Sequence, residues 1–142
     1  MLRTTTLLAL LLLSACRPRT ADRRASAGET WQGPIVAITD SMLDAGGSDT
    51  VRFGRLRSGE IAVQRLRIVN RTQRTTAIAS YDRSCGCTTL EFDPQPLAPG
   101  AGRQVEVIFD SRGESGWQFK RLDIRLAGAQ APLRLFVEAD VR

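Results

Sequence analysis

Gln104-Val-Glu-Val-Ile-Phe-Asp110 is the stretch of this sequence that decides the fold. Its apolar residues Val105, Val107 and Phe109 stand at every second position. Successive side chains of a β-strand point to opposite faces of a sheet, so this period of two predicts a strand with one buried face. We therefore expect residues 104–110 to form a strand that packs against a hydrophobic core.

Short segments of the same kind lie on both sides of this strand, and turn residues separate them. The further segments expected to form strands are 51–53, 61–69, 75–81, 88–92, 119–126 and 133–141. About seven short strands at this spacing, without a clear helix, predict an all-β fold, either an antiparallel sandwich or a barrel. The residues expected to be buried between two sheets are Leu66, Ile68, Val107, Phe109, Leu122, Ile124, Leu135 and Val137.

The first fifteen residues have the order of a secretory signal peptide. Arg3 supplies a positive charge, residues 7–13 are an apolar run, and Ser14 and Ala15 form a small-residue cleavage site before Cys16. The apolar run is far shorter than the roughly 20 residues that a spanning helix needs. Residues 13–16 (LSAC) resemble the bacterial lipobox, in which the cysteine is acylated. We therefore expect removal of residues 1–15 and a lipid anchor, including palmitate, on Cys16.

The rest of the chain divides by composition. Residues 16–30 are rich in Arg, Ala and Ser and are expected to be a flexible tether. Residues 31–48 are expected to be an N-terminal extension, in which 31–45 fits either a strand or a short helix. The β-sandwich domain is expected over residues 49–142.

The location of the charge bears on possible partners. The chain has 20 Lys and Arg against 15 Asp and Glu, a net charge of +5. Four arginines and one aspartate lie in residues 16–24, beside the expected anchor. A nucleic-acid-binding domain carries its positive charge on the folded surface, next to stacking aromatics. We therefore expect no nucleic-acid partner, and the arginines instead suit an anionic membrane surface.

Cys85 and Cys87 need an explanation, because two thiols one residue apart in an oxidising compartment are expected to react or to be protected. In an extended strand their Cα atoms would be about 6.5 Å apart, near the upper limit for a disulfide. Gly86 permits a bend that brings them closer. Three interpretations stay open: a structural disulfide or packed thiols, a redox dithiol in a strained small ring, and a two-thiolate site for Cu(I).

Several segments together resemble one protein family. They are Phe53–Glu60 (FGRLRSGE), Val69-Asn70, Ser84–Thr88 (SCGCT), Leu97–Gly100 (LAPG), Val105–Asp110 (VEVIFD), Gly113 and Gly116. The chain resembles the domain of unknown function 1573 family, which is related to the immunoglobulin-like modules of the ASPM/SPD-2/Hydin group. This resemblance implies an immunoglobulin-like antiparallel β-sandwich over residues 50–142 and a bacterial envelope location, but no activity. The chain has Asn70-Arg-Thr where the family has Asn-Thr-Gly, so the resemblance does not imply the conformation of that turn.

The residue types present argue against an enzyme. The chain has no histidine, which excludes histidine general bases and His-based nucleophile triads. No P-loop is present, and no second cysteine pair completes a four-thiolate zinc site. Asp82 and Asp93 are interpreted as turn residues, and Arg83 as a solvated side chain.

We therefore expect a non-catalytic, lipid-anchored envelope lipoprotein. It would bind an unknown envelope protein or other envelope component through its sheet faces, loops or an edge strand. Arg17 follows Cys16 and no acidic run is present, so we expect the protein to face the periplasm, on the outer membrane. The alternative is a thiol redox or copper-handling lipoprotein that uses Cys85 and Cys87.

Overall fold

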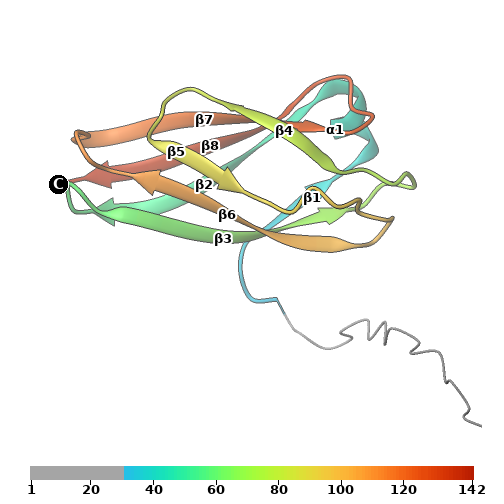
Figure 1. Ribbon diagram of the computed structural model, residues 1–142, viewed down its shortest axis with the longest axis horizontal. Helices are drawn as coiled ribbons and strands as arrows, with labels where there is room; N and C mark the ends of the chain where they lie inside the picture. The colour runs from blue at the N-terminus through green and yellow to red at the C-terminus, as the bar shows by residue number, and fades with distance from the viewer. Residues whose placement is uncertain (1–30) are drawn as a thin grey trace, which may run out of the picture. The chain divides into compact units, whose positions relative to one another are not determined.

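The computed structural model describes residues 31–142, so the expected signal peptide, tether and lipidated Cys16 lie outside the described residues. Eight strands form two sheets that pack face to face (Figure 1). The strands are β1 Ile35–Ile38, β2 Gly47–Leu56, β3 Ile61–Asn70, β4 Ile78–Arg83, β5 Thr88–Glu91, β6 Gly102–Asp110, β7 Gly116–Leu126 and β8 Leu133–Val141. Sheet one has the order β1-β3-β6-β5, and sheet two has the order β2-β8-β7-β4. The predicted all-β sandwich is confirmed.

Two strand pairs differ from the expected antiparallel arrangement. β1 runs parallel to β3, and β2 runs parallel to β8, whereas the remaining pairs in the described sheets are antiparallel. A period of two predicts which side chains are buried, but it carries no information on the direction of the neighbouring strand. Both parallel strands lie at a sheet edge, where the chain crosses from sheet one to sheet two.

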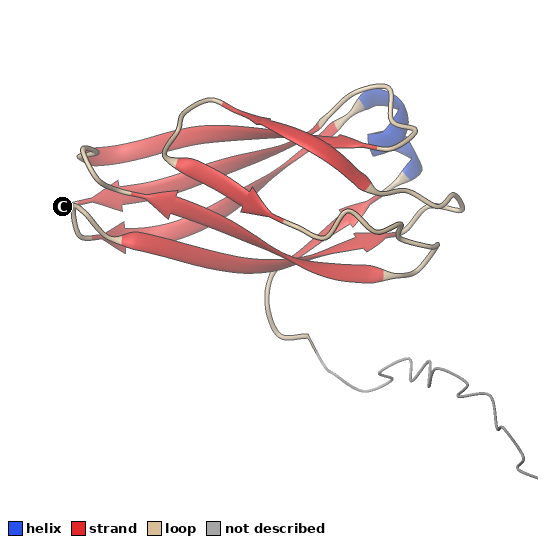
Figure 2. Ribbon diagram, viewed as in Figure 1, coloured by secondary structure: helices blue, strands red, loops and turns tan. Residues whose placement is uncertain are grey.

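The segment that crosses between the sheets packs into the same core as the later strands. Residues 31–45 contain both structures that the sequence allowed, the strand β1 and the helix α1 (Asp40–Ala45). Figure 2 shows this helix at one end of the sandwich. Ile38 and Leu43 are buried in the core, so the expected extension 31–48 is an integral part of the domain.

The helix α1 has a defined start and end. The hydroxyl of Thr39 accepts a hydrogen bond from the backbone N–H of Met42 at 3.3 Å, which satisfies one free donor of the first turn. Gly46 ends the helix with a φ of +79°, a conformation that favours glycine. A Cβ atom there would lie 2.9 Å from the carbonyl oxygen of Pro132.

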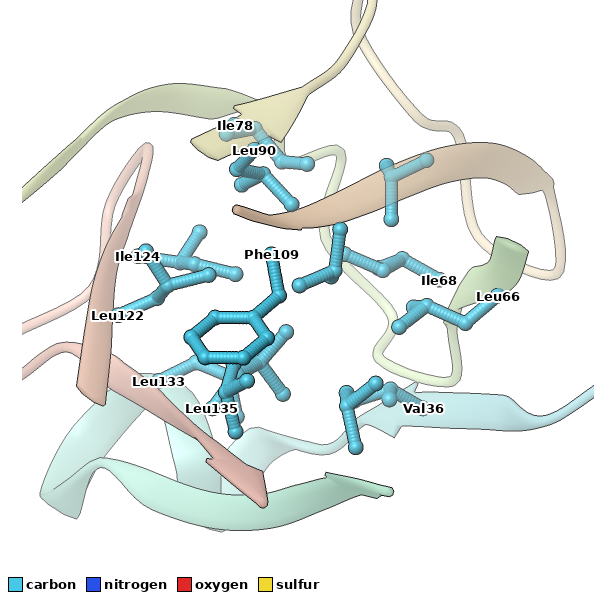
Figure 3. Close-up of a cluster of buried hydrophobic side chains, with 14 of the residues drawn as sticks. Val36, Leu66, Ile68, Ile78, Leu90, Phe109, Leu122, Ile124, Leu133 and Leu135 are labelled. Carbon is cyan, nitrogen blue, oxygen red and sulfur yellow. The ribbon is translucent and has the colours of Figure 1, made fainter. Parts of the chain in front are cut away.

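The core lies between the two sheets and agrees with the sequence pattern. Phe109 projects from β6 toward leucines of β7 and β8, with Leu66 and Ile68 of β3 beside it (Figure 3). All the residues that the period of two placed inside have 0% relative exposure: Leu66, Ile68, Val107, Phe109, Leu122, Ile124, Leu135 and Val137. The predicted facing of β3, β6, β7 and β8 is therefore confirmed.

The turn after β3 is organised by a buried side chain. The amide nitrogen of Asn70 donates hydrogen bonds to the carbonyl oxygens of Arg74 (2.7 Å) and Leu97 (2.9 Å). Its side-chain oxygen accepts from the backbone N–H and the hydroxyl of Thr72, at 3.0 and 2.8 Å. Side-chain hydrogen bonds within Asn70-Arg-Thr72 thus hold the turn in place. A glycine at position 72, as in the family pattern, would lack the hydroxyl that donates to Asn70.

Candidate functional site

Cys85 and Cys87 lie in the loop that joins β4 to β5, the edge strands of the two sheets (Figure 1). They form a disulfide, and their Cα atoms are 5.3 Å apart. This distance is shorter than in an extended strand because the chain turns at Gly86. Both cysteines are half-buried, and Cys87 packs against the hydrophobic core.

Hydrogen bonds hold the cysteine loop to both sheets. The backbone N–H of Ser84 donates to the carbonyl oxygen of Arg121 on β7 at 2.9 Å, and the N–H of Arg121 donates to the hydroxyl of Ser84 at 2.8 Å. On the side of sheet one, the N–H of Asp110 donates to the carbonyl oxygen of Cys87 at 2.8 Å. The disulfide therefore lies in a loop that is fixed at both ends, between two half-buried residues.

Of the charged residues near the cysteines, Asp82 differs from its interpretation, whereas Arg83 is exposed as expected. Asp82 lies on strand β4 and forms an ion pair with Arg125 at 2.9 Å, so its interpretation as a turn residue is wrong. The guanidinium of Arg83 donates a hydrogen bond to the carbonyl oxygen of Thr88 at 3.1 Å and so braces the loop. Asp93 does serve a turn, because its carboxylate accepts from the backbone N–H of Gln95 at 2.9 Å.

Across residues 31–142, no three or more histidine, cysteine, aspartate or glutamate side chains gather in a metal-binding arrangement. A soft metal such as Cu(I) would have the sulfurs of Cys85 and Cys87 as ligands only after the disulfide is reduced. In the described part of the chain, no helix combines the length and the apolar character that crossing a membrane requires.

A second candidate site lies on the outer face of sheet two. Trp117 and Phe119 stand two residues apart on β7 and project to the same face, with 67% and 55% of their surfaces exposed. Phe136 of β8 stacks on Phe119, with the ring centroids 5.0 Å apart and the planes 17° from parallel. We call these three residues the aromatic face. Large apolar side chains that gather on a surface are informative, because isolated ones are common and patches mark binding sites.

Charged pairs border the aromatic face. Because β2 runs parallel to β8, Arg52 lies opposite Glu138 and Arg55 opposite Asp140. The Nε atom of Arg52 is 3.1 Å from a carboxylate oxygen of Glu138, and that of Arg55 is 3.9 Å from Asp140. In the antiparallel pairing of β7 with β8, the same two acidic residues lie opposite Phe119 and Trp117. Each acidic side chain therefore stands between an arginine and an aromatic ring.

A small pocket opens between Trp117 and the arginines. Its volume is about 240 Å³, and its lining residues are Arg52, Gly54, Arg55, Trp117, Glu138, Ala139 and Asp140. Gly54 lies at a β-bulge with a φ of +73°, and a Cβ atom built there would meet nothing within 4 Å.

The aromatic face was not predicted from the sequence, because the expected strand began at Phe119. The structure begins β7 at Gly116, which brings Trp117 into the sheet. One signal was available, since the alternation of β8 sets Phe136 on the same side as Arg134 and Glu138, opposite the buried Leu135 and Val137. An aromatic residue on the polar face of a strand is the pattern that indicates such a site.

Comparisons with known proteins agree with the fold. A family described as protein of unknown function (DUF1573) matches residues 46–141. No curated protein matches the chain. A protein of unknown function from Porphyromonas gingivalis W83 aligns with 66% of this chain and 44% of its own length, at 19% identity and a TM-score of 0.55.

Parts of two solved proteases of Vibrio cholerae also align with this chain. The VesB protease aligns with 66% of this chain and 30% of its own, at 16% identity and a TM-score of 0.53. The secreted serine protease VesC aligns with 63% of this chain and 21% of its own, at 15% identity and a TM-score of 0.50. The chain thus spans less than half the length of these solved structures, and at such identities the likeness shows the fold alone.

Proposed function

This chain belongs to the DUF1573 family, whose function is unknown, and from that premise we propose that it is a non-catalytic binding module of the bacterial envelope. In this proposal a lipid on Cys16 holds the protein on a membrane, with the domain facing the periplasm. The domain engages an envelope component through the aromatic face on sheet two. The observation that carries the proposal is the exposure of Trp117 and Phe119 beside the stacked ring of Phe136.

The energetics support a binding role for these rings. Fully burying a side chain such as Phe contributes roughly 1.5–3 kcal/mol of favourable free energy. The domain does not gain this free energy while the rings stay in water. Tryptophan and arginine are the residue types that most often dominate binding energy at interfaces. The rings stand on β7 and β8, in the middle of a four-stranded sheet. Such a rigid surface loses little conformational entropy when a partner binds.

Photo-crosslinking in native envelopes tests this proposal. A photoreactive amino acid replaces Phe119 in the full chain, and a matched control carries it at Glu91, an exposed residue on β5 of sheet one. We expect adducts with an envelope component from position 119 and none from position 91. Adducts from position 91 alone, or from neither position, would contradict a binding role for the aromatic face.

A second candidate function rests on the cysteine loop. A half-buried disulfide between residues two apart in sequence supports a thiol redox or copper-handling role. Such a role requires a disulfide that a mild reductant opens and a thiol that reacts in the folded protein. Alkylation of the folded chain before and after mild reduction, with and without Cu(I), separates the possibilities. Rapid labelling after reduction supports the redox role, protection by Cu(I) supports the copper role, and no labelling leaves a structural disulfide.

A further inference from the structure

The ion pairs around the aromatic face contain more positive than negative charge. Asp123 pairs with two arginines, at 3.0 and 3.5 Å, and Asp140 pairs with two more, at 3.9 and 2.7 Å. In total, six arginines share four carboxylates, so these pairs carry a net charge of +2. The arginines are Arg52, Arg55, Arg121, Arg125, Arg134 and Arg142, and the carboxylates are those of Asp82, Asp123, Glu138 and Asp140.

The positive groups of these pairs are also the ones that solvent reaches. Each of the six arginine side chains is at least 52% exposed, whereas those of Glu138, Asp123 and Asp140 are only 18%, 19% and 23% exposed. A ligand that approaches the outer face of sheet two therefore meets mainly guanidinium groups. A guanidinium can hold two phosphate oxygens through parallel hydrogen bonds, and it always stays charged in proteins. This surface thus suits anionic phosphate groups.

The centre of the same face is apolar. Trp117 and the stacked rings of Phe119 and Phe136 stand on the two middle strands of sheet two. The surface of the pocket beside Trp117 is almost wholly apolar. Arg121 lies opposite Phe136 on β8, and the arginines of β2 lie on the other side of β8, so cations flank the rings on both sides. A membrane surface matches this pattern, because tryptophan favours the interface and cations favour anionic headgroups.

The proposed anchor would bring a bilayer within reach without selecting a face of the domain. Cys16 and Trp31 are fifteen residues apart, and a chain of that length spans up to about 50 Å. A domain of about 100 residues has a radius of gyration of only about 13 Å, so such a tether would not dictate the orientation. Tethering also keeps the bilayer at a high effective concentration, so a weak attraction is enough to orient the domain.

We propose that the aromatic face docks on an anionic phospholipid membrane. The three rings enter the interface between headgroups and acyl chains, and the arginines around them contact lipid phosphates. Sheet one then faces away from that membrane. This inference rests on the proposed binding function and names the envelope component that the aromatic face engages.

Quenching of tryptophan fluorescence by brominated phospholipids tests this inference. The chain has two tryptophans, Trp31 and Trp117, so the full chain with Trp31→Phe reports on Trp117 alone. It is reconstituted into vesicles of phosphatidylcholine and phosphatidylglycerol in equal parts, with and without brominated acyl chains. We expect emission at shorter wavelength than in vesicles of phosphatidylcholine alone, and loss of most of that emission with brominated lipid. Salt at about 1 M, where the Debye length is about 3 Å, should reverse much of this loss.

A matched reporter carries its single tryptophan on sheet one. In this variant Glu91→Trp is combined with phenylalanine at positions 31 and 117, so an aromatic residue remains on the docking face. Glu91 is exposed on β5, an edge strand of sheet one. Its tryptophan should keep its emission with brominated lipid, because docking through sheet two turns β5 away from the bilayer.

A pair of charge variants tests the role of the arginines. Arg121→Gln with Arg134→Gln removes the excess of +2 from the ion pairs of the docking face. Each cation near an anionic surface strengthens attachment about fivefold, so the ratio of docked to undocked domain should fall at least about tenfold. Arg65→Gln with Arg103→Gln removes the same charge from two ion-paired arginines of sheet one and should leave the quenching of Trp117 unchanged. Circular dichroism confirms that each variant is folded.

Three results would overturn the inference. They are no quenching of Trp117 in the mixed vesicles, equal quenching of the reporter at position 91, and unchanged quenching after Arg121→Gln with Arg134→Gln. If Trp117 is not quenched while position 119 still crosslinks to an envelope protein, the membrane inference fails and the proposed binding function stands. If both experiments are negative, both fail.

Discussion

Replacing Phe109 with alanine tests which face of strand β6 is buried in the core. The packing of the two sheets depends on that orientation. Phe109 has 0% exposure, lies among side chains of both sheets, and packs its ring 6.0 Å from that of Phe53. Removing a buried Phe ring loses its transfer free energy and leaves a cavity, and together these cost about 3–5 kcal/mol. Typical domains have a total stability of about 5–15 kcal/mol, so the loss should be a large share.

Urea unfolding followed by circular dichroism measures this change, with Phe119→Ala as the matched control. The chemistry of the two substitutions is identical, but Phe119 is on the outer face and mostly exposed. Its loss should cost about 1 kcal/mol or less. If Phe109→Ala does not fold, Phe109→Leu keeps most of the buried volume and should give an intermediate, measurable loss. Equal midpoints for wild type and Phe109→Ala, or a larger loss for Phe119→Ala, would refute the assigned facing.

Three further predictions address the anchor, the turn after β3 and the cysteine loop. Mass spectrometry of the mature N-terminus should find acylated Cys16, and Cys16→Ser should abolish acylation; an unmodified N-terminus at another residue would falsify the anchor. Asn70→Ala removes one donor from each of the carbonyl oxygens of Arg74 and Leu97 and removes the acceptor of the Thr72 N–H, so it should cost about 2–4 kcal/mol in urea unfolding; an unchanged midpoint would contradict the described turn. Replacing both Cys85 and Cys87 with serine should cost only about 1–2 kcal/mol, because the closed loop is so short; a loss as large as that of Phe109→Ala would show that the disulfide contributes much more than loop closure.

The core was predictable from the sequence, because burial on one face of a strand imposes a period of two. Val107 and Phe109 on β6, and Leu122 and Ile124 on β7, follow that period and are fully buried. The parallel pairing of β1 with β3 and of β2 with β8 was not predictable. It depends on where the chain crosses between sheets, and the residues of α1 at that crossing carry no signal of strand direction.

The candidate sites were predictable only in part. The sequence singled out Cys85 and Cys87, but whether they bond depends on the bend at Gly86, which sets their Cα distance at 5.3 Å. The pocket beside Trp117 was not predictable, because it combines three strands. Its bulge at Gly54 lies more than sixty residues before Trp117 in the chain, and only the pairing of β2 with β8 and of β8 with β7 brings them together.

Hydroxyl-radical footprinting of Trp117 tests whether a partner covers the aromatic face in the envelope. The oxidation rate of Trp117 is measured by mass spectrometry in intact envelopes and in the purified full chain, with Trp31 as the internal reference. We expect rapid oxidation of Trp117 in the purified chain, where 67% of its surface is exposed, and clear protection in envelopes. Equal oxidation of Trp117 in both samples, relative to Trp31, would contradict it.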